Sequence, residues 1–158
     1  MSSLIDTLLS QAARGAMSMD GVVSEFSPAE IRQTIADLVA RDQLTLANAL
    51  SDAGLSLYPE SEDILAISAL LAEAQSDWSA AEQLLEQLVQ VQGAMTTPMT
   101  WRHLIRVQRC HCEPAKALAS ALQAVSVHPA DAGLAQELAD LIEMTSDQAL
   151  VAAPSRAQ

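Results

Sequence analysis

The chain has 158 residues, half of them apolar but only 3% aromatic, and a formal net charge of −12. Its alanine, leucine, glutamine and glutamate favour helix, and the β-branched and aromatic enrichment of sheets is missing, so we expect an all-α fold with a core of its own. A chain with only eight basic residues will not bind nucleic acid or an acidic membrane surface by bulk attraction.

The compartment follows from three negative features of the sequence. The N-terminal stretch MSSLIDTLLSQAAR has no positive charge before Arg14 and carries Asp6 among its apolar residues, which makes it a poor secretory signal. No apolar run approaches the roughly 18 to 20 residues needed to span a bilayer, so we expect no membrane insertion. Cys110 and Cys112 are a poor disulfide framework because a single residue separates them. We expect a cytoplasmic protein.

Two elements are expected before the main body of the chain. Residues 2–13 predict an N-terminal helix, followed by a loop around GAMSMDGVV. The segment Ser27-Pro28-Ala29-Glu30 has the form of a capping box with proline at the first helical position, so a helix should begin at residue 28. Thr97-Pro98 repeats the cap-then-proline form before the last repeat of the chain.

The central part of the chain has an internal period. The segments 40–59, 74–93 and 110–129 align when their alanines are superposed (Ala47, Ala81 and Ala117), with spacings of 34 and 36 residues. Twelve positions after the alanine each segment ends in a turn residue (Pro59, Gly93 and Pro129), and sixteen before it a large apolar residue opens a periodic stretch (Ile31, Leu65 and Trp101). Such a period predicts stacked helix-turn-helix units.

This pattern resembles the tetratricopeptide repeat. Trp101-Arg102-His103-Leu104 matches the opening Trp-x-x-Leu of that family, and Asp77-Trp78 followed by Ala81 matches its turn and its crossing alanine. The resemblance implies three repeats at about 28–59, 62–95 and 98–131. The family's usual turn glycine is replaced (Asp42, Ser76 and Cys112), as is the usual tyrosine of the first helix (Leu38, Ala72 and Gln108).

The last repeat is followed by one more amphipathic segment. Residues 131–144, DAGLAQELADLIEM, predict a helix that caps the open end of the stack. Residues 145–158 have no periodic face, and we expect a disordered tail. The whole of 1–144 is expected to form a single helical domain.

The segment Arg109-Cys110-His111-Cys112 is the only cluster with reactive side chains. A structural zinc site needs about four ligands, and the remaining candidates, His103 and His128, lie two helical turns back and at the far end of the next helix. Arg109 and His111 would favour a thiolate, but the C-terminal end of a helix opposes one. We therefore interpret the cluster as a helix end and turn, with a thiol or zinc sensor as an alternative. Phosphate loops, H-E-x-x-H and G-x-S-x-G are absent, so we predict no enzyme, no metal and no cofactor.

The basic residues are concentrated in the third repeat. Arg102, Arg106 and Arg109 follow the spacing i, i+4, i+7 and form a stripe on one helix face. In the tetratricopeptide fold the first helices line a concave groove, and the resemblance implies that this groove contains Arg32, Val39, Leu70, Met99, Arg102, Arg106 and Arg109. Arg32, Arg102 and Arg106 also match basic positions of the carboxylate-clamp subset of these repeats, whereas Ala36 and Leu70 replace its asparagines. Such a groove suits an extended peptide with acidic and aliphatic side chains. The alternative is a solvated stripe that pairs with neighbouring Asp and Glu, for instance on the capping helix.

The sequence therefore predicts a non-enzymatic module that binds a protein or peptide partner. Its plan is similar to that of the small three-repeat chaperones of bacterial type III secretion, which implies a cytoplasmic chaperone or adaptor for an extended segment of a secreted translocator, and a homodimer through the N-terminal helices. A structural or assembly subunit of a larger complex is the alternative.

Overall fold

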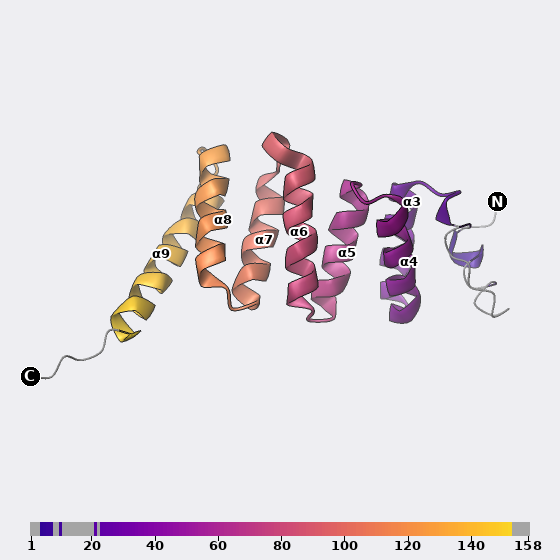
Figure 1. Cartoon of the computed structure of the whole chain (residues 1–158), viewed down its shortest axis with the longest axis horizontal. Coiled ribbons are helices and arrows are strands. Elements are labelled where there is room, and N and C mark those ends of the chain that lie inside the picture. Colours follow the sequence, from indigo (N-terminus) through magenta and orange to yellow (C-terminus); the bar gives the residue numbers. More distant parts are fainter. Residues whose placement is uncertain (1–3, 8–9, 11–20, 22, 153–158) are drawn as a thin grey trace, which may run out of the picture. The chain divides into compact units, whose positions relative to one another are not determined.

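The computed structural model describes residues 4–7, 10, 21 and 23–152, and every regular element within them is helical (Figure 1). The all-α prediction is confirmed. The chain divides into two compact units, Met1–Val91 and Gln92–Gln158, and the single domain over 1–144 stays a prediction. Residues 4–7 and 10 are helical, and the rest of the N-terminal helix expected at 2–13 lies outside the described residues.

Unit 1 contains two helix pairs. Helices α3 (Pro28–Ala40) and α4 (Leu44–Leu57) form the first, and α5 (Glu62–Ala74) and α6 (Trp78–Gln92) the second, with α6 ending one residue into unit 2. Its core is aliphatic, with Ile31, Ile35, Leu50 and Ile64 fully buried. Gly54 lets α4 pack closely against Ile64, because a Cβ atom at position 54 would lie only 3.3 Å from the Ile64 side chain.

Unit 2 contains one pair and a longer terminal helix. A short 3-10 turn, η1 (Gly93–Met95), precedes α7 (Pro98–Cys110), α8 (Pro114–Val127) and α9 (Ala132–Ala152). Trp101, Ala117 and Leu134 are buried between these helices. The three helix pairs fall within the predicted repeats 28–59, 62–95 and 98–131, so the prediction of three helix-turn-helix repeats is confirmed.

The last helix differs from the prediction. Helix α9 continues through Ala152, so the expected end at residue 144 and the disordered tail from residue 145 are wrong as far as residue 152. Residues 153–158 lie outside the described part of the chain. The prediction relied on the missing apolar face, but no glycine or proline interrupts the segment before Pro154. The Thr145 and Ser146 hydroxyls also donate to carbonyls of the preceding turn, at 2.9 and 2.7 Å.

The helix starts use the predicted caps. The hydroxyl of Ser27 accepts a hydrogen bond from the backbone N–H of Glu30, whose carboxylate accepts one in return from the backbone N–H of Ser27. The Ser27 hydroxyl also donates to the Glu30 carboxylate at 2.7 Å, and this bond, with the backbone bond, holds the pKa of Glu30 below its usual range. Thr97 caps α7 in the same position, accepting from the backbone N–H of Thr100 at 3.2 Å.

The turns inside the three pairs share one geometry. Asp42, Ser76 and Cys112 replace the usual turn glycine, and each has a left-handed backbone, with φ of 58°, 60° and 61°. In each turn this residue donates from its N–H to the carbonyl three residues earlier, and the next residue donates to the carbonyl five residues earlier. This is the Schellman end of an α-helix, which normally uses glycine. The Cys110–Cys112 segment therefore forms a helix end and turn, as we interpreted it.

Candidate functional site

The predicted groove residues of unit 1 lie on the exposed face of its first helices. Val39 of α3 and Leu70 of α5 are brought together in a hollow of about 210 Å³. We call this the apolar hollow, and its lining is Ile35, Ala36, Val39, Ile67, Leu70, Leu71 and Ala74. The side chain of Leu70 is 47% exposed, an unfavourable position for so large an aliphatic group in water. Sequence reasoning missed Ile35 and Ile67, although their distances of four and three residues from Val39 and Leu70 place them on the same helix faces.

Arg32 lies on α3 and pairs with Asp63 on α5, so the pair joins the two helices that line the hollow. Its Nε is 3.0 Å from the Oδ1 of Asp63 at the start of α5, and each side chain is about half exposed. An exposed pair of this kind contributes about 0–1 kcal/mol to stability. Arg32 is therefore already engaged, and an acidic ligand would compete with Asp63 for it.

The predicted groove residues of unit 2 lie on α7. Met99 is 79% exposed, and Arg102, Arg106 and Arg109 are all exposed. Arg102 forms an ion pair with Asp131, and Arg109 lies 3.9 Å from Glu137 and 3.9 Å from the sulfur of Met144. Two of the three stripe arginines therefore pair with the beginning and middle of the capping helix, which is the alternative we left open.

The same repeat position holds an arginine in both units, but the two arginines pair with acids at different positions. Arg32 and Arg102 are equivalent in the repeat, and the residue 31 positions later is Asp63 in one case and Gly133 in the other. The guanidinium of Arg102 occupies the space where a side chain at position 133 would lie. Gly133 thus makes room for Arg102 to reach back to Asp131.

The two acidic residues that meet the arginines of α7, Asp131 and Glu137, have pKa values shifted in opposite directions. The pKa of Asp131 lies below its usual range, chiefly because the backbone N–H of Leu134 donates to its carboxylate at 2.9 Å, with Arg102 adding to the effect. Burial raises the pKa of Glu137, and the nearby Arg109 only partly offsets it. Asp131 is the N-cap of α9, which accounts for its stronger stabilisation as an anion.

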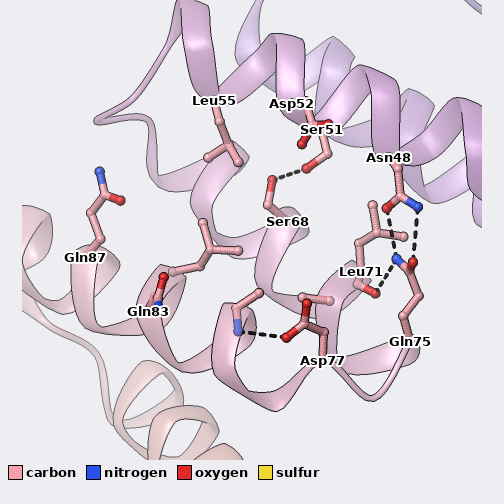
Figure 2. Close-up of a pocket in the computed structure, with 13 residues that line it drawn as sticks. Asn48, Ser51, Asp52, Leu55, Ser68, Leu71, Gln75, Asp77, Gln83 and Gln87 are labelled. Atoms are coloured by element: carbon pink, nitrogen blue, oxygen red, sulfur yellow. Dashed lines mark hydrogen bonds between the residues drawn. The ribbon is translucent and has the colours of Figure 1, made fainter.

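A second concave site lies on the other side of α5 and was not predicted. Figure 2 shows this polar cleft, a space of about 460 Å³ between α4, α5 and α6. Its lining is Asn48, Ser51, Asp52, Leu55, Ser68, Leu71, Ala72, Gln75, Asp77, Ala80, Gln83, Leu84 and Gln87. The signal available in the sequence was the helical spacing of the α4 members, residues 48, 51, 52 and 55, which share one face.

Charge is distributed very unequally between the units. Residues 1–91 contain fourteen acidic and three basic residues, a net charge of −11, and residues 92–158 contain six and five, a net charge of −1. The acidity of the chain is therefore concentrated in unit 1, where the polar cleft lies.

The cysteine cluster is open to solvent. Cys110 and Cys112 are free thiols and are exposed. Among the described residues, no group of three or more His, Cys, Asp or Glu side chains is arranged to hold a metal ion. None of the described helices combines the length and the apolar character that crossing a bilayer requires.

Comparisons with known proteins support the fold. No protein-family model matches the chain, and no curated protein resembles it in sequence. Solved structures do match it, among them the tetratricopeptide domain of Sgt2 from Aspergillus fumigatus, with a TM-score of 0.64 at 14% identity, over 83% of this chain and 87% of that one. MamA from Desulfovibrio magneticus matches with a TM-score of 0.62 at 16% identity, over 94% and 87%. PilF of Pseudomonas aeruginosa matches with a TM-score of 0.61 at 16% identity, over 91% and 68%. The chain thus has the fold of a tetratricopeptide-repeat domain.

Proposed function

We propose that the chain is a non-enzymatic protein-binding module that holds an aliphatic side chain of a partner segment in the apolar hollow. The observation that carries this proposal is the exposure of Leu70 beside Val39 on the face of α3 and α5. An apolar hollow with a half-exposed leucine gains stability when another apolar side chain removes it from water.

The charged residues on the helices of the hollow determine which charges the rest of the partner segment should carry. Arg32 and Asp63 lie on the helices that form the hollow, so an extended segment crossing it meets a positive and a negative group. Within unit 1 the hollow is expected to supply most of the affinity, and Arg32 to supply selectivity for an acidic side chain. Unit 2 has an apolar and basic surface of its own, formed by Met99 and the arginines of α7, where an acidic ligand would have to displace Asp131 or Glu137.

Affinity capture with matched variants tests the proposal. Leu70→Arg places a charge at the hollow, whereas Leu44→Arg places the same charge at another half-exposed leucine of unit 1, on α4. We expect proteins from a lysate of the source organism to be retained by the wild type and Leu44→Arg but lost from Leu70→Arg. Capture of the same proteins by all three, with each variant folded by circular dichroism, would contradict the proposal.

Within this function we further propose a cytoplasmic chaperone or adaptor, similar in plan to the three-repeat chaperones of type III secretion. Three repeats and a long terminal helix in a short acidic chain support this assignment. The partner would then be a secreted translocator, and the N-terminal segment would join two copies. Co-expression with a candidate translocator should render it soluble, and light scattering should give the mass of a dimer. A stable complex with a large assembly instead would favour the role of a structural subunit.

A further inference from the structure

We propose that the polar cleft of unit 1 binds a basic segment of a partner protein, with arginine or lysine side chains contacting Asp52 and Asp77. These two aspartates are the only charged residues among the lining of the cleft. Asp52 comes from α4 and Asp77 from the turn before α6, so two different elements present the carboxylates (Figure 2).

The walls of the cleft are held in place by hydrogen bonds. The side-chain amides of Asn48 and Gln75 bond reciprocally, at 3.1 and 2.9 Å, and join α4 to the end of α5. Beneath them the hydroxyls of Ser51 and Ser68 lie 2.6 Å apart and are buried. Because these contacts fix the width of the cleft before any ligand arrives, little ordering is left for binding to perform.

The neutral lining suits a polypeptide backbone. Side-chain amides both donate and accept hydrogen bonds, so they can pair with the N–H and C=O groups of an extended segment. Gln83 is exposed on α6, one turn before Gln87, whose amide donates to the carbonyl of Pro59 at 2.9 Å. The exposed side-chain amides would bind the backbone of the segment. The carboxylates of the cleft would bind its basic side chains.

Charge complementarity favours a basic occupant. Unit 1 has a net charge of −11, and no basic residue lines the cleft. Among the described residues, none forms an ion pair with Asp52. Asp77 caps α6 through one carboxylate oxygen, which accepts from the N–H of Ala80 at 3.0 Å, and its charge remains to attract a cation. Hydrogen bonds between ionised partners are the strong ones, and the surrounding negative field would speed association.

The openness of the cleft favours a protein segment over a small ligand. Asp52, Gln75, Asp77 and Gln83 are all exposed. Small-molecule sites usually bury about 70–90% of their ligand, which an open cleft cannot do. A side chain reaching in from a bound segment needs no such enclosure.

The cleft is separate from the apolar hollow. The hollow lies between α3 and α5, and the cleft between α4, α5 and α6, so α5 stands between the two. The basic segment is therefore a second partner site, and its failure would leave the proposed function of the hollow intact.

Selection from a displayed library of random peptides tests the proposal. The probe variant is Asp52→Asn with Asp77→Ser, in which serine keeps the helix cap. The matched control is Glu60→Gln with Glu86→Gln, which removes the same charge from exposed positions of unit 1 outside the cleft. We expect wild type and control to select peptides with arginine or lysine at a fixed position. The cleft variant should bind those peptides about tenfold or more weakly, the size of one lost charge-assisted hydrogen bond.

NMR of the side-chain amides locates the binding. The selected peptide should shift the NH₂ resonances of Asn48, Gln75 and Gln83 in the wild type. Equal weakening in both double variants would show attraction by bulk charge and overturn the proposal. Peptides without a fixed basic residue, unshifted amide resonances, or equal affinity for free arginine methyl ester would overturn it as well.

Discussion

Replacing Ser76 by glycine should stabilise the chain, because Ser76 holds a φ of 60° in a turn that favours glycine. A residue with a Cβ loses about 1–2 kcal/mol in the left-handed region. Glycine avoids this loss, but its greater freedom in the unfolded chain lowers the free energy of unfolding by about 0.5–1 kcal/mol. The difference predicts a net stabilisation of about 0.5–1 kcal/mol. Cys112→Gly should behave alike at φ 61°, and Asp42→Gly should gain less, because aspartate tolerates this conformation better.

Urea and thermal unfolding followed by circular dichroism measure the effect. For a chain of this size, 1 kcal/mol corresponds to a change in Tm of about 2–4 °C. Ser76→Val is the opposing variant, since a β-branched side chain is least tolerated at positive φ, and it should unfold below the wild type. A Ser76→Gly protein that unfolds at or below the wild-type temperature, or a Ser76→Val protein as stable as the wild type, would refute the reasoning from strain.

Three further predictions each concern a contact inside a single unit. Ser51→Ala and Ser68→Ala should each cost about 1–2 kcal/mol by leaving a buried hydroxyl unpaired, and the double variant should cost less than their sum in urea denaturation. Gly133→Ala should stabilise the Arg102→Ala protein by up to about 1 kcal/mol, because alanine has the higher helix propensity. In the wild type the same change should have little effect, because the new methyl group displaces the Arg102 guanidinium from Asp131. Equal effects in both backgrounds would contradict this. The pKa of Asp131 is lowered in the folded state, so its charge stabilises the fold at neutral pH and this contribution is lost as the pH falls through the lowered value. Asp131→Asn, which keeps the cap, should show a shallower fall in Tm between about pH 4 and pH 2, and an unchanged profile would count against the assignment.

The parts of the fold that depend on short-range sequence were predictable. The period of the alanines Ala47, Ala81 and Ala117 located the helix crossings, and all three are fully buried. The caps at Ser27 and Thr97 also agree with the structure, because capping depends on residues three positions apart.

The parts that depend on side chains from different helices were not predictable. The spacing of Arg102, Arg106 and Arg109 showed a stripe but could not show whether acids of α9 would meet it. The polar cleft likewise combines three helices, and no single segment carries its pattern. The end of α9 was missed for another reason, since residues 145–152 show no apolar periodicity in the sequence.

Helix α5 is the common wall of the two proposed sites, the apolar hollow and the polar cleft. Leu71, only 4% exposed, lines both the apolar hollow and the polar cleft. A ligand that shifted the Leu71 side chain in one site would alter the lining of the other, and thermodynamic linkage would then require each ligand to change the affinity of its counterpart by the same factor. The packing of Leu71 would thus couple the two proposed partners.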